Sequence, residues 1–290
     1  MDNLTNISTI KNILNEHGFT FSKKLGQNFL INPSVCPKMA EMSDVDKNIG
    51  VIEIGPGIGV LSVELAKRAK KLVCIEIDDR LKPILEKTLA PYENTDVIFG
   101  DVMQLDLHKI IDDNFQGMDI VVCANLPYYI TTPIIMKFLE ERLPIKSITV
   151  MVQKEAAVRL CALPGSRDVG AVTISLRYYC DPKILFGVSR GSFMPAPDVD
   201  SSVIRLNILE NPVIDVVDEK MFFKVVKSCF STRRKTISNC LNSTFGISKD
   251  ILGKILLSCD ISPTARAEQL SMKEFGLLSD AFSKHMNNKK

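Results

Sequence analysis

The 290-residue sequence contains no tryptophan, only three histidines and no C-x-x-C pair. Its eight cysteines are scattered, and the closest two, Cys229 and Cys240, are eleven positions apart. This spacing argues against a zinc ribbon and against a redox motif. The histidines, at positions 17, 108 and 285, lack neighbouring carboxylates or cysteines at ligand spacing, so we expect no metal site. Scattered thiols within apolar segments are typical of core residues in a reducing cytoplasm.

Long apolar segments are also missing. The longest unbroken apolar run, Ile120–Ala124, has five residues, whereas a membrane-spanning helix needs roughly 20. The first 20 residues carry a single Lys11 and no apolar stretch, so we expect no secretory signal. The composition, 46% hydrophobic and 24% charged, is that of a globular protein. We therefore expect a cytoplasmic protein without a membrane partner.

Charge is nearly balanced over the whole chain but is unevenly distributed. The net charge is +2, yet residues 211–290 contain 13 Lys and Arg against 8 Asp and Glu, a balance of +5. The upstream part has the remaining 23 basic and 26 acidic residues, a balance of −3. A basic C-terminal part suggests a polyanionic partner, although a solvated helical face would give the same excess.

Between residues 49 and 153, short apolar runs alternate with helical patterns. The runs are nearly pure apolar, as expected for strands that are buried on both faces. The segment Arg80–Leu89 has a helical apolar stripe, and we interpret Thr132-Pro133 as the cap and first-turn proline of another helix. Five β–α units predict a doubly wound parallel sheet. The five strands are expected at Val51–Ile54, Leu72–Ile77, Asp96–Phe99, Ile120–Ala124 and Ile148–Val152.

The pattern changes twice in the second half of the chain. Two apolar runs, Ala171–Cys180 and Ser202–Ile208, have no convincing helix between them, and we interpret them as an antiparallel pair that closes the sheet edge and completes seven strands. After Asn211-Pro212 the periodicity is purely helical, and Ser271 and Glu274 have the spacing of a capping box. We therefore predict an α/β domain at residues 1–210 and a small all-helical domain at residues 211–290.

A glycine-rich turn follows the first strand directly. The segment Glu53–Gly59 reads EIGPGIG, and its glycines, among them Gly55 and Gly57, allow a ligand to approach the backbone at a helix N-terminus. The spacing is G-x-G-x-G rather than the G-x-G-x-x-G of the dinucleotide fingerprint. Glu76 ends the second strand and suits the hydroxyls of a ribose, which both NAD and S-adenosylmethionine contain. Asp101 ends the third strand and suits an adenine amino group, although Gly-Asp is also a common turn.

The segment Asn125-Leu126-Pro127-Tyr128-Tyr129 follows the fourth strand. The exocyclic amine of adenine is a poor nucleophile, because its lone pair is delocalised into the ring. The Asn125 side-chain oxygen and the Leu126 carbonyl can accept its two N–H bonds, while Pro127 holds the loop rigid. Tyr128 offers a π-face for a flipped base. These residues have no place in hydride chemistry, which disfavours a dehydrogenase.

Several segments carry a resemblance to a known family. EIGPGIG (53–59), GD (100–101) and NLPYY (125–129) resemble the S-adenosylmethionine-dependent adenine-N6 methyltransferases. Further segments narrow the resemblance to the small-subunit ribosomal RNA adenine N6,N6-dimethyltransferases, the KsgA or RsmA family. This resemblance implies a Rossmann-like class I methyltransferase fold and covers nearly the whole chain. The further segments are LGQNFLINP (25–33), VQKEAAVRL (152–160), PGSRDVG (164–170), FMPAPDVDS (193–201), FSTRRKTI (230–237) and RAEQLSMKEF (266–275).

The resemblance also implies roles for particular residues. Asn28 and Leu30 of the N-terminal arm (residues 1–30) would contact the methionine end of the cofactor, together with Asn125. Phe193 would hold the target base against Tyr128. The chain departs from the family at Val169, where tyrosine is usual, and at Val172-Thr173-Ile174. The implied assignments for the methionine moiety, ribose and adenine are the Gly55 loop, Glu76 and Asp101.

Basic residues are the candidates for RNA contact. Arg233-Arg234-Lys235 lies between two amphipathic helices, which suits an RNA backbone, and the resemblance supports that assignment. The remaining candidates, for which a plain surface role is the alternative, are Lys23, Lys24, Lys220, Lys224 and Lys227.

The sequence thus predicts an enzyme that uses S-adenosylmethionine, without a metal, to dimethylate two adjacent adenosines. By resemblance, these lie in a hairpin loop near the 3′ end of 16S rRNA in the 30S particle or its precursor, and the enzyme acts as a monomer without an obligate protein partner. One alternative is the 23S rRNA adenine-N6 methyltransferase that confers macrolide resistance. Another is a ribosome-assembly checkpoint factor that acts mainly by binding.

Overall fold

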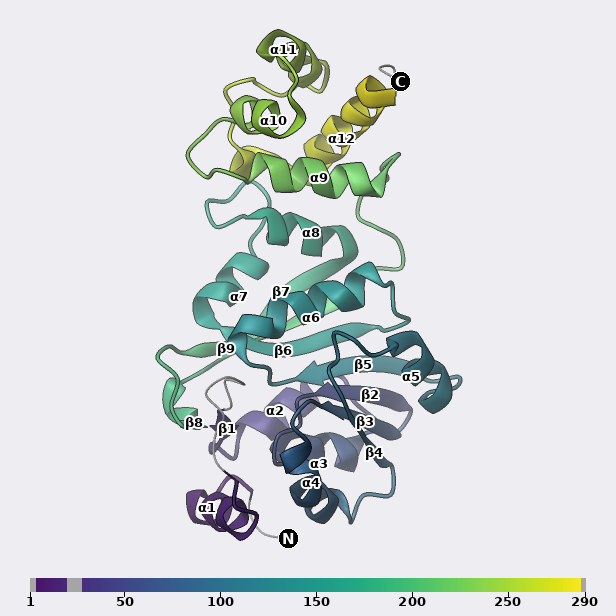
Figure 1. The fold of residues 1–290 in the computed structure, drawn as a ribbon, viewed down its shortest axis with the longest axis vertical. Helices are drawn as coiled ribbons and strands as arrows, with labels where there is room; N and C mark the ends of the chain where they lie inside the picture. Colours follow the sequence, from purple (N-terminus) through teal and green to yellow (C-terminus); the bar gives the residue numbers. More distant parts are fainter. Residues whose placement is uncertain (1–3, 20–27, 288–290) are drawn as a thin grey trace. The chain divides into compact units, whose positions relative to one another are not determined.

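A seven-stranded mixed sheet is the centre of the structure, a computed structural model that describes residues 4–19 and 28–287. The strand order is β4-β3-β2-β5-β6-β9-β7 (Figure 1). Strands β2 to β6 pair in parallel, and β9 runs antiparallel to β6. The strands are β2 (Ile49–Ile54), β3 (Lys71–Glu76), β4 (Thr95–Phe99), β5 (Asp119–Ala124), β6 (Ser147–Gln153), β7 (Cys180–Val188) and β9 (Ser201–Ile208). Each of the five predicted parallel strands is found within two residues of its expected bounds.

Helices connect the parallel strands, so both sheet faces are covered. Val51, Leu72 and Cys123 point from neighbouring strands into one core cluster, which they share with residues of α1, α2, α3 and α4. The alternate positions Ile52 and Val122 are equally buried, as they must be when the opposite face is also covered. The helices are α1 (Ile7–Glu16), α2 (Val35–Glu41), α3 (Val60–Arg68), α4 (Lys82–Leu89, after the 3₁₀ turn η2, Asp79–Leu81), α5 (Leu107–Asn114) and α6 (Tyr128–Glu140).

A small second sheet joins distant parts of the chain. Strand β1 (Phe29–Leu30) pairs antiparallel with β8 (Phe193–Met194), and Leu30 is opposite Phe193. The Ile31 N–H extends this pairing by donating to the Ser192 carbonyl at 2.8 Å. Residues 29–31, at the end of the predicted N-terminal arm, are therefore held beside the segment that precedes β9, while residues 1–3 and 20–27 of the arm fall outside the described residues.

The prediction of a strand at Ala171–Cys180 is wrong. This segment forms helix α8 (Ala171–Tyr179), after α7 (Lys154–Leu160), and the edge strand β7 begins only at Cys180. The β-branched residues favour a strand, but Ile174 and Tyr178 are buried one helical turn apart. Thr173 Oγ1 accepts the Gly170 N–H at 3.0 Å and caps the helix start. A short apolar run fits either element, and here packing decides for the helix.

The predicted start of a helix at Thr132-Pro133 is also wrong. Helix α6 begins at Tyr128, with Pro127 at the cap, and Pro133 lies inside it. The Ile130 N–H and the Thr131 hydroxyl both donate to the Pro127 carbonyl, at 3.1 and 3.0 Å, and close the first turn. Pro133 cannot donate to the carbonyl of Tyr129, so α6 lacks this one backbone hydrogen bond.

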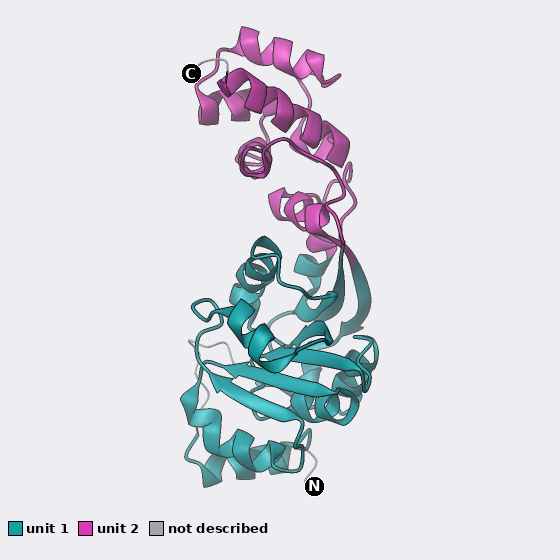
Figure 2. Cartoon of the chain, turned by 90° about the vertical axis from the view of Figure 1, so that its right-hand side faces the viewer, with its two compact units in different colours: residues 1–157, 183–208 teal, residues 158–182, 209–290 magenta. Residues whose placement is uncertain are grey.

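The chain divides into two compact units (Figure 2). The first contains residues 1–157 and 183–208, and the second contains residues 158–182 and 209–290. The division after residue 208 lies close to the boundary expected near 210, but residues 158–182 group with the C-terminal helices instead of with the α/β part. The C-terminal elements are α9 (Glu219–Cys229), α10 (Ile237–Phe245), α11 (Lys249–Ser258), the 3₁₀ turn η4 (Ala267–Gln269) and α12 (Met272–Asn287).

The second unit has its own aromatic core. Phe222, Phe275 and Phe282 are fully buried, and the rings of Tyr178 and Phe222 pack with centroids 4.9 Å apart. The predicted capping box at Ser271 is present, because the Ser271 N–H donates to Glu274 Oε2 at 2.7 Å and the Glu274 N–H donates to Ser271 Oγ at 3.2 Å.

All eight cysteines lie in the described residues and are free thiols. Seven are buried, and Cys161 is partly exposed. Burial raises the pKa of Cys123 to about 12 and that of Cys161 to about 11. In the described part of the chain, no helix is both long and apolar enough to cross a membrane.

Candidate active site

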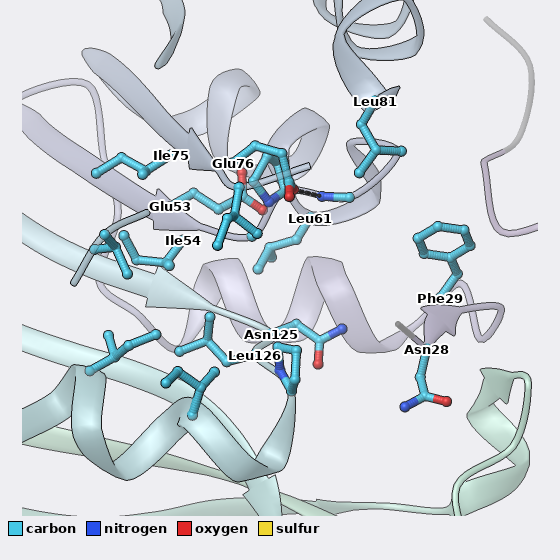
Figure 3. Close-up of a pocket in the computed structure, with 18 of the residues that line it drawn as sticks. Asn28, Phe29, Glu53, Ile54, Leu61, Ile75, Glu76, Leu81, Asn125 and Leu126 are labelled. Atoms are coloured by element: carbon cyan, nitrogen blue, oxygen red, sulfur yellow. Dashed lines mark hydrogen bonds between the residues drawn. The ribbon is translucent and has the colours of Figure 1, made fainter. Parts of the chain in front are cut away.

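The carboxyl ends of β2, β3, β4 and β5 meet at one edge of the sheet, where they open onto a cavity of about 410 Å³. This volume is in the range of small-molecule sites. All of the residues predicted for cofactor binding and catalysis line this cavity, and Figure 3 labels Asn28, Glu76, Asn125 and Leu126 among them. They are Asn28, Leu30, Gly55, Gly57, Glu76, Asp101, Asn125, Leu126, Pro127, Tyr128 and Phe193.

The glycine-rich turn passes between β2 and α3 in a conformation that disfavours side chains. Gly55, Gly57 and Gly59 have φ values of 69°, 60° and 92°, in the left-handed region that favours glycine. A Cβ on Gly59 would also lie 2.8 Å from Thr88 Cγ2, and one on Gly57 would lie 3.2 Å from Phe29 Cε1. The turn therefore exposes bare backbone to the cavity at the start of α3.

Glu76 braces this turn from the neighbouring strand. Its Oε2 accepts the Gly57 N–H at 3.1 Å, and its Oε1 accepts the Asp78 N–H at 2.9 Å. A dashed line in Figure 3 marks the hydrogen bond at the Glu76 carboxylate. The side chain is only 4% exposed, and burial raises its pKa above the ordinary value, while the two backbone donors act in the opposite direction. A carboxylate has about four acceptor positions, so Glu76 keeps acceptor capacity for a ligand beside these backbone bonds.

Asp101 is another acid of the cavity, two residues after the end of β4. Its Oδ1 accepts the Met103 N–H at 2.9 Å, and its Oδ2 accepts the Gln104 side-chain amide at 3.2 Å. These bonds fix the carboxylate at the end of β4, and the side chain remains partly exposed.

Three of the cavity residues that sequence reasoning missed lie at or beside strand ends. Glu53, at the start of the EIGPGIG segment, is 1% exposed and accepts the Cys74 thiol at 3.4 Å. Burial raises the pKa of Glu53 to about 7. Ile77 and Val102 also line the cavity, each immediately after a strand-end acid. Their positions in the sequence could have indicated them, since each residue lies at or beside a strand end that was already assigned to the site.

The Asn125–Tyr128 segment forms the wall opposite the N-terminal arm. Asn125 follows the last residue of β5, and its amide projects into the cavity in Figure 3. Leu126 is 5% exposed, and Pro127 directs the chain into α6. Tyr128 is half-buried, and its hydroxyl lies 2.7 Å from Ser201 Oγ. Burial raises the pKa of Tyr128, and the bond to Ser201 opposes that shift.

The arm contributes Asn28 and Leu30 through the β1–β8 pairing. Phe193 lines the same cavity but is only 4% exposed, so it offers a base far less surface than Tyr128 does. Asn32 supports this wall, because its amide donates to Ser192 Oγ at 3.2 Å.

None of the predicted RNA-binding residues that the structure describes lines the cavity. Lys23 and Lys24 fall outside the described residues. Lys220, Lys224, Lys227, Arg233, Arg234 and Lys235 belong to the second unit and are all exposed. In that unit the Lys224 ammonium lies 4.9 Å from the Phe245 ring centroid, and the Arg233 guanidinium donates to the Arg167 carbonyl at 3.5 Å.

Comparison with known proteins identifies the family. The model of the family described as ribosomal RNA adenine dimethylase matches residues 18–284. The chain belongs to the ribosomal RNA adenine dimethylase family. The chain is 46% identical over 289 residues to proteins named ribosomal RNA small subunit methyltransferase A from Bacillus cytotoxicus and Bacillus mycoides. Each match covers 98% of this chain and 99% of the relative.

Solved structures resemble the chain over most of its length. A dimethyladenosine transferase from Plasmodium falciparum is 28% identical, with a TM-score of 0.74 over 88% of this chain and 98% of that one. The 23S rRNA methyltransferase ErmE is 23% identical, with a TM-score of 0.67 over 88% of this chain and 99% of that one. The chain therefore has the class I methyltransferase fold that its motifs predict. Among the described residues, no group of three or more His, Cys, Asp or Glu side chains is placed to hold a metal ion.

Proposed function

We propose that this enzyme transfers methyl groups from S-adenosylmethionine to the N6 atoms of two adjacent adenosines of 16S rRNA. The observation that carries the proposal is the convergence of Gly55, Glu76, Asp101 and Asn125 on one cavity, with Tyr128 in the same wall. The names of the Bacillus relatives favour the small subunit as the substrate particle.

The cavity residues fit the parts of the proposed cofactor. The remaining acceptor positions of Glu76 suit the ribose hydroxyls, and Asp101 suits the adenine amino group. Ile77 and Val102 give apolar surface beside those acids, as a purine ring requires. The bare backbone of the glycine turn, with Asn28 and Leu30, would hold the methionine moiety. When bound, S-adenosylmethionine supplies an electrophilic methyl group.

The wall opposite the arm would prepare the target base. The Asn125 side-chain oxygen and the Leu126 carbonyl would accept the two N–H bonds of the adenine amine, which draws the nitrogen toward tetrahedral geometry and frees its lone pair. Tyr128 would stack on the flipped base, and Phe193 would limit the depth to which the base enters. A general base is not required, because the methylated ammonium loses its proton readily to water.

The second unit would supply attraction for the RNA backbone. Its exposed cations include Arg233, Arg234 and Lys235, and phosphate contacts of this kind position a protein without reading sequence. The active site then requires only a base that can be flipped at a cost of a few kcal/mol. The enzyme would act as a cytoplasmic monomer on the 30S particle or its precursor.

Tritium transfer from labelled S-adenosylmethionine tests this function directly. Purified 30S particles that lack the modification should accept up to four methyl groups each, on two adenosines, whereas 50S particles and naked 23S rRNA should accept none. Preferential labelling of 23S rRNA would favour the macrolide-resistance activity instead. Tight 30S binding without transfer would favour a checkpoint role based on binding.

A further inference from the structure

The active-site tyrosine is tied to a residue distant in sequence. The Tyr128 hydroxyl and Ser201 Oγ are 2.7 Å apart, although 73 positions separate the two residues. Tyr128 is the first residue of α6, and Ser201 is the first residue of β9. Ser201 is 1% exposed, so water has little access to its hydroxyl.

The segment that carries Ser201 is anchored on both sides. Asp200 Oδ1 accepts the Arg190 N–H at 2.9 Å, and the Asp200 carbonyl accepts the Lys154 N–H at 3.0 Å. The Arg190 guanidinium also donates to the Asp198 carbonyl at 3.3 Å. Ser201 itself is in register with Gln153 of β6. Its hydroxyl is therefore held at a fixed point of the sheet.

The ring of a half-buried tyrosine at the start of a helix needs such a fixed point. The χ2 torsion of tyrosine is broad and roughly two-fold, so the backbone of α6 alone leaves the tilt of the ring weakly determined. The para hydroxyl lies on the χ2 axis, so a hydrogen bond there fixes the direction of the ring axis. Because the phenolic O–H prefers to lie in the ring plane, a partner held at a fixed point also favours one ring plane. The ring plane is what a stacked base contacts.

We infer that Ser201 is a positioning residue that orients the Tyr128 ring for stacking on the target adenine. The inference rests on the proposed function, since a flipped base is the ligand that the ring receives. Ser201 acts through the tyrosine and need not contact the substrate. Ser201 is the last residue of the FMPAPDVDS segment (193–201), so this segment contributes to the positioning of the base.

A double-mutant cycle on the full-length enzyme tests this role. Tyr128→Phe keeps the π-face and removes only the hydroxyl, while Ser201→Ala removes its partner. A net hydrogen bond of ordinary strength predicts that each variant loses about 2- to 10-fold in kcat for tritium transfer to unmodified 30S particles. The KM for 30S should stay within about twofold, because docking depends on the basic residues of the second unit. The double variant should be no slower than the slower single variant.

Matched measurements separate positioning from a general structural effect. Ser147→Ala removes a buried hydroxyl of β6 for which the described residues provide no hydrogen-bond partner, and it should keep wild-type kcat. Calorimetry should give the wild-type affinity for S-adenosylmethionine in both single variants. If Ser201→Ala does not fold, Tyr128→Phe alone decides, since a full wild-type kcat in that variant overturns the role.

Two further outcomes also overturn the inference. Losses that multiply in the double variant would mean that the two hydroxyls act independently, and an unchanged kcat in Ser201→Ala would mean that the bond does not serve catalysis. A wild-type enzyme that methylates no adenosine in either subunit would overturn the proposed function as well. If the wild type is active and the losses in kcat of the two single variants multiply in the double variant, only the positioning role is overturned.

Discussion

Replacement of Glu76 by alanine is the sharpest test of the cofactor assignment. The carboxylate already accepts the backbone N–H groups of Gly57 and Asp78, at 3.1 and 2.9 Å, and its remaining acceptor positions are the ones assigned to the ribose. A hydrogen bond to a charged group is worth about 1.5–3 kcal/mol. Glu76→Ala should therefore weaken S-adenosylmethionine binding by about 10- to 150-fold.

Titration calorimetry with S-adenosylmethionine measures this change directly. Glu76→Gln should fall between the wild type and the alanine variant, because its one carbonyl oxygen can still accept a bond while its amide opposes a backbone donor. Asp79→Asn removes a negative charge from an exposed position nearby that does not line the cavity, and its affinity should be unchanged. A folded Glu76→Ala variant with wild-type affinity would refute the assignment of Glu76 to the ribose.

Three other changes have defined outcomes. Asn125→Ala should keep 30S binding but lose about 10²-fold or more in methyl transfer, as expected for loss of a positioned polar group; a normal rate would contradict the proposed chemistry. Neutralising Arg233, Arg234 and Lys235 together should weaken 30S binding and flatten its salt dependence by up to about one unit of slope per lost contact, with unchanged affinity for S-adenosylmethionine. Burial raises the pKa of Glu53 from 4.5 to about 7, so the folded protein holds this proton more tightly than the unfolded chain does. The free energy of unfolding is therefore highest below pH 4.5 and falls by about 3 kcal/mol in total as the pH rises from 4.5 through 7. Urea unfolding of Glu53→Gln should accordingly show a growing advantage over the wild type between pH 5 and pH 8, and parallel pH profiles would disprove this.

Sequence alone predicts the parallel half of the sheet well. Strands buried on both faces give short pure apolar runs, and strand-end residues then converge by topology, which is why the predicted residues Glu76, Asp101 and Asn125 meet in one cavity. Their proposed roles remain predictions, to be tested by the experiments above.

The failures of sequence reasoning have local physical causes. The segment Ala171–Tyr179 combines strand-forming residue types with a helical burial pattern, and contacts with α9 favour the helix. Pro133 favours a helix start because proline suits the first turn, but α6 begins five residues earlier, at Tyr128, and includes this proline. Glu53 was overlooked as an individual residue because a sequence does not show that a strand-end carboxylate is almost completely buried.

The distribution of thiols gives the chain a built-in set of local reporters. Cys36, Cys74 and Cys123 belong to the first unit, whereas Cys161, Cys180, Cys229, Cys240 and Cys259 belong to the second. A maleimide applied to the native protein should modify the partly exposed Cys161 first, since each buried thiol reacts only when its surroundings open. Peptide mapping of the slower modifications would then give separate opening free energies for the two units, without any engineered label. If added S-adenosylmethionine slows maleimide modification only at Cys36, Cys74 and Cys123, the ligand stabilises the first unit alone.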